Sequence, residues 1–191
     1  MPPDEADNAT DQRRLAELAR AARSGDRAAT AELLRALQDP IYRFALAQLA
    51  DPDAAAEATQ ETGLRLLRAI GRFEGRSRVT TWALGVALNV CREQRRKRTT
   101  QSDPERIEAT PDRAPSTEAV LGLGEDQQRL HDALDALAPR QREAITLRYL
   151  QQLSLAETAQ AMGCSPGAVK ATVWQALRRL RTTFSGEEIG S

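Results

Sequence analysis

The chain has 191 residues, of which 41% are hydrophobic and only 4% aromatic, and its 27 basic residues balance its 27 acidic ones. This length suffices for one domain or two small ones, with a core built mostly from leucine, alanine, valine and isoleucine. The abundance of alanine and leucine and the scarcity of strand-like runs favour an all-α fold. No segment resembles a signal peptide or approaches the length of a membrane span, so we expect a cytoplasmic protein.

Cysteine and histidine are too few for several kinds of site. The two cysteines, Cys91 and Cys164, fall in separate helical segments, and His131 is the single histidine. A disulfide framework or a zinc site would need more of these residues, and no Ser-His-Asp or Cys-His set can be assembled convincingly. No phosphate-cradling glycine loop is present. We therefore expect no enzyme, no catalytic residue, no metal and no cofactor, with both thiols reduced.

The first half of the chain has the apolar periodicity of helices, separated by helix-start signals. Residues 1–11 are polar and should be disordered. Ser24-Gly25-Asp26 and Asp39-Pro40 interrupt the pattern, and Asp51-Pro52 should cap a further helix. The predicted helices cover residues 12–22, 27–38, 41–50 and 53–69, with Leu64, Leu67 and Ile70 facing the core.

A basic helix ends the first half. The loop Gly71 to Arg78 (GRFEGRSR) precedes a helix that starts at Thr80 or Thr81 and ends in the basic run Arg92 to Arg98 (REQRRKR). Local charge of this kind is typical of nucleic-acid interfaces, even though the net charge is zero. Residues 99–117 hold three prolines and several acids, and we interpret them as a flexible linker. The sequence thus predicts two small helical domains, residues 12–98 and 118–184, and a polar tail at 185–191.

The second domain contains a helix-turn-helix pattern. Ser154 and Glu157 have the spacing of a capping box, and Gly163 suits the position just past the end of that helix. Ser165 can then cap a second helix with Pro166 at its first position. A short helix, a glycine turn and a longer basic helix form the motif whose second helix enters the major groove of DNA.

The second helix of this motif carries groups that can bond phosphates and base edges. Lys170, Trp174 and Arg178 recur every four residues along the flank of its apolar stripe, with Thr172 and Gln175 further round. The alternative is a solvated helix face with Trp174 packed against a neighbour. With the capped turn in front, we favour DNA binding for the unit as a whole.

The combination of both halves resembles the extracytoplasmic-function (ECF, group IV) sigma factors of bacterial RNA polymerase. The resemblance covers nearly the whole chain outside the first residues and the tail, and both halves match in the right order. Its more specific parts are Gln60-Glu61-Thr62, Arg72-Phe73-Glu74-Gly75, Thr81-Trp82, Asn89 and the Leu-x-x-Arg-Gln-Arg-Glu entry at Leu137 to Glu143.

The resemblance implies a function and assigns roles to residues. Such proteins bind core RNA polymerase, direct it to promoter DNA and help to open it, and an anti-sigma factor, usually tied to the membrane, is their habitual partner. Core-polymerase contacts would come from Asp53, Glu57, Gln60, Glu61 and Arg65. The minus-ten element would be contacted by Phe73, Arg76, Arg78, Asn89, Arg92 and Arg96, with a base flipped out into the loop. The minus-thirty-five element would be contacted by Ser165, Lys170, Thr172, Trp174, Gln175 and Arg178.

Two other classes of protein share parts of this pattern. A helix-turn-helix transcription regulator that is not a sigma subunit can have a very similar second half, but it would normally carry a sensing domain with strands in front. A helical adaptor that binds only proteins would leave Trp82, Asn89 and the arginines after it without a purpose.

Overall fold

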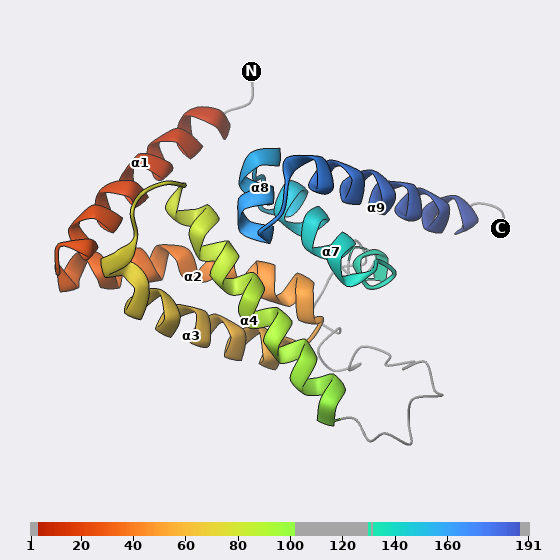
Figure 1. Ribbon diagram of the computed structural model, residues 1–191, viewed down its shortest axis with the longest axis horizontal. Helices are drawn as coiled ribbons and strands as arrows, with labels where there is room; N and C mark the ends of the chain where they lie inside the picture. The colour runs from red at the N-terminus through yellow and green to blue at the C-terminus, as the bar shows by residue number, and fades with distance from the viewer. Residues whose placement is uncertain (1–3, 102–129, 131, 188–191) are drawn as a thin grey trace.

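The computed structural model describes residues 4–101, 130 and 132–187, and every regular element within these ranges is helical (Figure 1). The all-α prediction is therefore confirmed. The elements are α1 (Asp4–Arg23), α2 (Arg27–Leu49), α3 (Pro52–Ala69), η1 (Ile70–Arg72), α4 (Val79–Gln101), α7 (Pro139–Ile145), η3 (Thr146–Leu150), α8 (Leu155–Met162) and α9 (Pro166–Glu187). Residues 99–101 of the predicted linker form the end of α4, and residues 102–117 lie outside the described residues.

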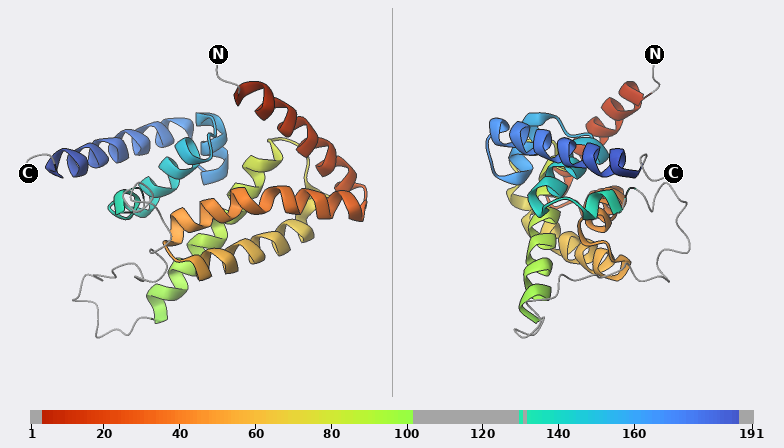
Figure 2. Two further views of the ribbon diagram at one scale, coloured as in Figure 1. Left: turned by 180° about the vertical axis from the view of Figure 1, so that it is seen from behind. Right: turned by 90° about the vertical axis from the view of Figure 1, so that its right-hand side faces the viewer.

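The first domain is organised around α2, which packs against α1, α3 and α4 (Figures 1 and 2). Leu33, Leu37, Ile41 and Phe44 form its buried stripe, and none is more than 3% exposed. Each such side chain contributes about 1.5–3 kcal/mol when removed from water. The stripe continues past Pro40, where the sequence predicted a break between two helices.

The prediction of separate helices around Pro40 was wrong. A proline inside a helix loses one backbone hydrogen bond and costs about 3 kcal/mol. Leu37 and Ile41, on either side of the proline, are 1% and 3% exposed and belong to the same core. Their burial offsets the cost of Pro40, so packing outweighs the local helix-break signal.

The start of α1 also differs from the prediction. The helix begins at Asp4 and includes residues 4–11, which we expected to be disordered, and it continues to Arg23. The predicted start near Gln12 depended on apolar periodicity, and the first leucine of the helix is Leu15. That signal cannot locate helical turns that contain no large apolar residue.

The buried face of α3 consists mostly of small residues, with Leu66 as its one large apolar side chain. Asp51 caps the helix, as predicted, by accepting from the Ala54 N–H at 3.0 Å. Leu64 and Leu67, expected in the core, are 49% and 50% exposed, whereas Ile70 is buried as expected. The buried residues of α3 are Ala54, Ala55, Ala58, Thr59, Thr62 and Leu66.

The small residues on the buried face of α3 have a physical consequence for packing. Alanines and threonines on that face let the backbone of α3 lie close to α2 and α4, both of which it contacts. The buried hydroxyls of Thr59 and Thr62 donate to the carbonyls of Ala55 and Ala58, each at 2.7 Å, so their burial leaves no donor unsatisfied. Leu64 and Leu67 are therefore left on the outer surface, while Leu66 is buried.

The predicted helix-turn-helix is confirmed at α8 and α9. The Ser154 side chain accepts from the Glu157 N–H at 3.2 Å, and the Glu157 carboxylate accepts from the Ser154 N–H at 2.9 Å. Gly163 has a φ of 66°, the left-handed conformation that ends α8. Ser165 caps α9 by accepting from the Ala168 N–H at 3.2 Å.

The two domains are docked on each other through one continuous core. Ala144, Leu147, Ala159, Met162 and Val169 of the second domain belong to the same buried cluster as the residues of α2 and α4. Figures 1 and 2 show α7 and α8 resting on α4 and on the end of α2. The structure is therefore that of a closed, docked arrangement of the two predicted domains.

Candidate nucleic-acid and polymerase interfaces

The outer face of α9 presents the side chains that the sequence singled out for DNA. Lys170, Gln175 and Arg178 are exposed, and Trp174 is 63% exposed. The Arg178 guanidinium lies 5.7 Å from the centre of the Trp174 ring, a cation–π arrangement on the open surface. Because Trp174 is so exposed, it does not pack against a neighbouring helix, and the alternative interpretation of this residue was wrong.

Two further candidates on α9 have structural partners. Ser165 is exposed and its Oγ caps the helix. Thr172 is half-buried, and its hydroxyl donates to the Ala168 carbonyl at 2.8 Å. The four candidates Lys170, Trp174, Gln175 and Arg178 therefore form the open part of the face, while these two contribute mainly to the helix itself.

The basic end of α4 is partly neutralised by the second domain. The Glu143 carboxylate of α7 accepts from Arg92 Nε at 3.0 Å and Nη2 at 2.7 Å, and from Arg95 Nη2 at 2.7 Å. The Glu143 side chain is 2% exposed, so this is a buried, charge-assisted contact. The hydrogen bond to Glu143 also raises the pKa of Arg92.

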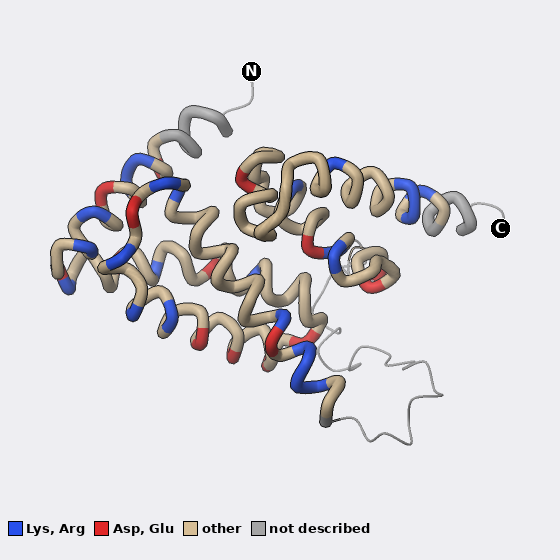
Figure 3. Tube along the Cα trace, in the orientation of Figure 1, with Lys and Arg blue, Asp and Glu red and all other residues tan. Residues whose placement is uncertain are grey.

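The remaining minus-ten candidates on α4 are open. Asn89 and Arg96 are exposed, and Figure 3 shows the basic residues gathered toward the C-terminal end of this helix. The structure thus separates two sets of residues that the sequence treated as one. Asn89 and Arg96 are accessible to a ligand, whereas Arg92 is held by Glu143.

The loop before α4 is also tied to the second domain. The Arg78 guanidinium makes a bidentate contact with the Glu157 carboxylate of α8. Burial opposes the charged form of Glu157, but hydrogen bonds from Arg78 and Ser154 outweigh it and lower the pKa to about 2. Phe73 packs on Trp82 with ring centres 4.9 Å apart, and Arg76 pairs with Glu74 at 2.6 Å.

Sequence reasoning missed the role of both docking carboxylates. Glu157 matched a capping box and Glu143 the entry to the second domain, and neither pattern indicates a partner in the other domain. Gln48 and Thr146, buried and joined at 3.1 Å across the same interface, were also missed. A possible signal was the polar Gln48 within the apolar end of α2, because a buried amide needs a hydrogen-bond partner.

The outer face of α3 combines polar and apolar groups. Asp53, Glu57 and Gln60 are exposed, and Leu64 and Leu67 expose about half of their surface beside them. The exposed leucines extend the predicted polymerase surface by an apolar component that sequence analysis had assigned to the core.

Two predicted polymerase contacts on α3 already have partners. Arg65 donates to Glu61 at 2.7 Å and to both oxygens of Glu93 on α4, at 2.8 and 2.6 Å. The hydrogen bond from Arg65 lowers the pKa of Glu93. Arg65 therefore joins α3 to α4 through Glu93.

The described cysteines and acidic residues can be considered for metal and thiol chemistry. Among the described residues no group of three or more histidine, cysteine or acidic side chains could hold a metal ion. Both cysteines are free, and burial raises the pKa of the Cys91 thiol to about 12, which keeps it protonated and unreactive. In the same part of the chain, no helix is both long and apolar enough to cross a membrane.

Comparison with known proteins matches both domains. The family model described as Sigma-70 region 2 matches residues 33–101, and the model described as Sigma-70, region 4 matches residues 127–180. Helix α1, which ends at Arg23, precedes both matches.

Individual relatives match most of the chain. The ECF RNA polymerase sigma factor BldN of Streptomyces coelicolor is 34% identical over 176 residues, which cover 90% of this chain and 66% of that protein. The ECF RNA polymerase sigma factor SigC of Mycobacterium tuberculosis is 32% identical over 173 residues, covering 88% of this chain and 90% of the relative. The sigma factor RpoE from Bartonella quintana, solved in complex with the anti-sigma factor NepR, is similar in structure, with a TM-score of 0.67 and 25% identity over 81% of this chain and 95% of that one.

Proposed function

The chain belongs to the extracytoplasmic-function sigma factors of the sigma-70 family, and from this premise we propose how its surfaces divide the work of transcription initiation. The second domain reads the upstream promoter element, the first domain captures the downstream element as it opens, and α3 attaches both to core RNA polymerase. The observation that carries the proposal is the exposed face of α9, with Trp174 and Arg178 in contact on its surface.

On the minus-thirty-five element, α9 enters the major groove. Lys170 and Arg178 supply charge-assisted bonds to phosphates and base edges, and Gln175 can bond a base edge in two places. Trp174 supplies exposed apolar area for thymine methyl groups or sugars. Ser165 and Thr172 stabilise the first turns of α9 through their hydrogen bonds to the backbone of Ala168.

On the minus-ten element, the first domain binds one strand of the opening duplex. Asn89 and Arg96 are free to contact it, and Phe73 and Arg76 lie at the loop that would take a flipped base. Arg78 and Arg92 are engaged by Glu157 and Glu143. Since a phosphate cannot replace the buried Glu143 carboxylate at Arg92 without moving α7, full use of this surface requires the two domains to separate.

The polymerase surface is the outer face of α3. Asp53, Glu57 and Gln60 offer polar contacts, and Leu64 and Leu67 offer apolar area to a partner helix. Glu61 and Arg65, the other two candidates, act mainly by holding α3 on α4 through Glu93.

Regulation and location follow from the same function. An anti-sigma protein would compete for these surfaces, as the complex of the Bartonella relative with NepR suggests. The chain would work in the cytoplasm, where polymerase and DNA meet, and could be held at the membrane by such a partner. It would supply recognition only and catalyse no reaction of its own, since the polymerase makes the RNA.

The test is reconstitution with core RNA polymerase that lacks any sigma factor. The two proteins should co-elute on a sizing column, and the complex should start RNA at discrete positions on genomic DNA fragments. Absence of a complex with folded chain, or a complex that starts RNA only at random ends, would refute the proposal. Binding of duplex DNA without polymerase would instead support a helix-turn-helix regulator.

A further inference from the structure

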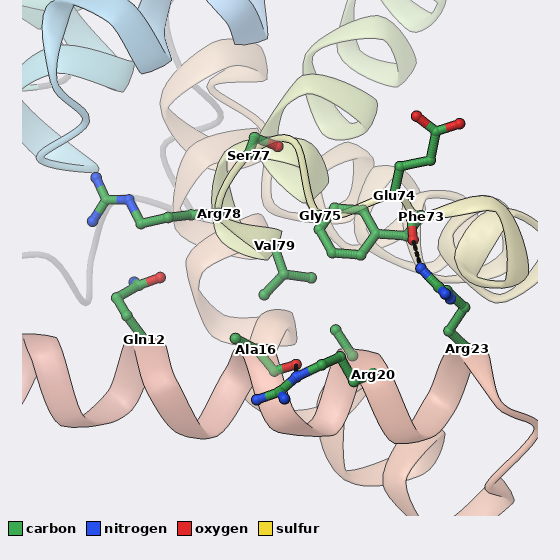
Figure 4. Close-up of a pocket in the computed structure, with 11 residues that line it drawn as sticks. Gln12, Ala16, Arg20, Arg23, Phe73, Glu74, Gly75, Ser77, Arg78 and Val79 are labelled. Carbon is green, nitrogen blue, oxygen red and sulfur yellow. Dashed lines mark hydrogen bonds between the residues drawn. The ribbon is translucent and has the colours of Figure 1, made fainter.

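A cavity of about 320 Å³ lies between α1 and the loop that leads into α4. Figure 4 shows Arg20 and Arg23 on α1 facing Phe73 across this space. The volume is at the lower end of the range for small-ligand sites. The matched family regions begin at residue 33, so the α1 wall of the cavity is built from a part of the chain that precedes them.

The α1 wall carries two guanidinium groups without acidic partners. Arg20 donates to the Ala16 carbonyl of its own helix and Arg23 to the Phe73 carbonyl, each at 3.4 Å. Among the described residues, neither guanidinium lies within ion-pair distance of a carboxylate. Residues three apart on a helix are neighbours on its surface. The two groups therefore keep most of their N–H donors for one shared anion with several oxygens, such as a phosphate.

The acidic residue on the lining does not neutralise this wall. The Glu74 carboxylate pairs with Arg76 at 2.6 Å, and Figure 4 shows it directed away from α1. The third arginine on the lining, Arg78, points toward the second domain, where Glu157 holds it. An anion in the cavity would therefore meet the positive charge of α1 without a competing carboxylate.

The wall opposite α1 is aromatic and apolar. Phe73 is half-buried and packs on Trp82, with ring centres 4.9 Å apart, so its ring is held in place. Val79, also on the lining, is buried, and Gly75 adds no side chain to fill the space. A cationic wall opposite an aromatic wall matches the two ends of a small phosphate ester that carries a planar ring, as nucleoside phosphates do.

The docked arrangement of the domains leaves this cavity open to a small ligand. In the described part of the chain, the α1 guanidinium groups bond only within the first domain. Arg92, which the minus-ten strand would contact under the proposed function, is held by the buried Glu143 of the second domain. A free ligand can therefore enter the cavity before the domains separate, whereas the strand needs them to separate first.

We propose that this cavity is a regulatory site for a free nucleoside phosphate, with the phosphate bound by Arg20 and Arg23 and the ring lying against Phe73. The bound ligand joins α1 to the loop and fills space that the minus-ten strand needs, so it opposes promoter binding. Occupancy of the site is independent of the proposed function, whereas its effect on promoter binding rests on it.

The fluorescence of Trp82 measures occupancy in the full chain. The chain has two tryptophans, and Trp174→Phe leaves Trp82, which contacts Phe73, as the single reporter. At least one of the diphosphates of adenosine, guanosine, cytidine and uridine should change this fluorescence saturably. Inorganic phosphate at the same ionic strength should bind about ten-fold more weakly, because it lacks a ring to stack. Absence of a saturable change with all four diphosphates would overturn the inference, as would equal affinities for diphosphate and phosphate.

Arginine variants of the Trp174→Phe chain locate the bound phosphate. Arg20→Ala/Arg23→Ala should bind the diphosphate about ten-fold more weakly than the parent, because both charge-assisted contacts are removed. Arg13→Ala is the matched control and should bind like the parent, since Arg13 is exposed on the same helix and does not line the cavity. Because Arg20 and Arg23 are exposed, the double variant should keep the parent's unfolding temperature without ligand. Equal affinities of the double variant and the control would contradict the assignment.

Competition in the complex of the full chain with core RNA polymerase tests the regulatory role. The diphosphate should weaken the binding of a single-stranded minus-ten oligonucleotide by wild type and by Arg13→Ala, and it should leave the strand affinity of the double variant unchanged. Equal weakening in the double variant, or none in wild type, would overturn the regulatory role. A wild-type chain that binds the diphosphate but forms no complex with polymerase would refute the proposed function and support the ligand site itself.

Discussion

Replacement of Glu143 by Gln should loosen the docking of the two domains. The Glu143 carboxylate accepts three hydrogen bonds from Arg92 and Arg95, and it makes no ion pair within its own domain among the described residues. Removing one partner of a buried ion pair costs about 3–5 kcal/mol. The two arginines are 30% and 23% exposed, so water can partly solvate them and we expect a smaller loss, about 2–3 kcal/mol.

This loss should be visible as a change in shape. A change of about 2–3 kcal/mol shifts an equilibrium roughly 30- to 150-fold. The radius of gyration measured by small-angle X-ray scattering should therefore rise in Glu143→Gln, and backbone amides of α4 and α8 should exchange hydrogen faster. Glu32→Gln is the matched control, because it removes the same charge from the exposed Arg14–Glu32 pair within the first domain and should change stability by less than about 1 kcal/mol.

The opposite result would refute the reasoning about docking. If Glu143→Gln keeps the wild-type radius of gyration and amide exchange, the shared apolar core alone holds the domains together. If it unfolds the second domain while the first stays folded, Glu143 stabilises its own domain rather than the interface.

Three further changes should have measurable effects. Gly63→Ala should raise the free energy of unfolding by about 0.5–1 kcal/mol in denaturant titrations, since Gly63 lies inside α3 with no atom within 4 Å of an added Cβ. Docking of the two domains should weaken as the pH falls from about 4.5 to 2. The pKa of Glu157 is lowered to about 2, so its negative charge stabilises docking fully above the ordinary pKa of 4.5 and is lost as the pH falls. Small-angle X-ray scattering at several pH values measures the resulting change in radius of gyration. Lys170→Ala and Arg178→Ala should each weaken the binding of promoter DNA by about 1–3 kcal/mol. Transcription from a mapped promoter should fall accordingly.

Each of these changes has its own control. Gly25→Ala should destabilise, because Gly25 has a φ of +95°, and equal effects of both alanines would contradict the explanation. Glu157→Gln should remove the acid-dependent part of the opening while keeping the capping box, and an unchanged pH profile would argue against Glu157 as its source. Unchanged transcription from both α9 variants would count against α9 as the recognition helix.

Local signals were sufficient to predict the second domain. Ser154, Glu157, Gly163 and Ser165 each satisfy a backbone group that a helix end leaves open, so their positions determine where α8 and α9 begin and end. The outward side of α9 then follows from the period of its apolar stripe. This is why the candidates on α9 could be named from sequence and four of them lie on its open face.

Tertiary packing decided what the sequence could not predict. Alanine and threonine occupy most of the inner face of α3, beside Leu66. A rule that places the largest apolar residues inside therefore assigned Leu64 and Leu67 to the core as well. Pro40 stayed within α2 because buried residues flank it. Contacts between the domains, above all those of Glu143, join residues far apart in sequence and leave no periodic pattern in the chain.

A footprint of the assembled complex on one of its promoters tests the central claim most directly. We predict two separate protected segments. The upstream duplex segment should disappear in Lys170→Ala and Arg178→Ala, and the downstream segment, with unpaired, permanganate-reactive thymines, should disappear in Asn89→Ala and Arg96→Ala. A single protected duplex site without unpaired bases, sensitive only to the α9 variants, would contradict this division of labour and indicate a protein that binds DNA through its helix-turn-helix alone.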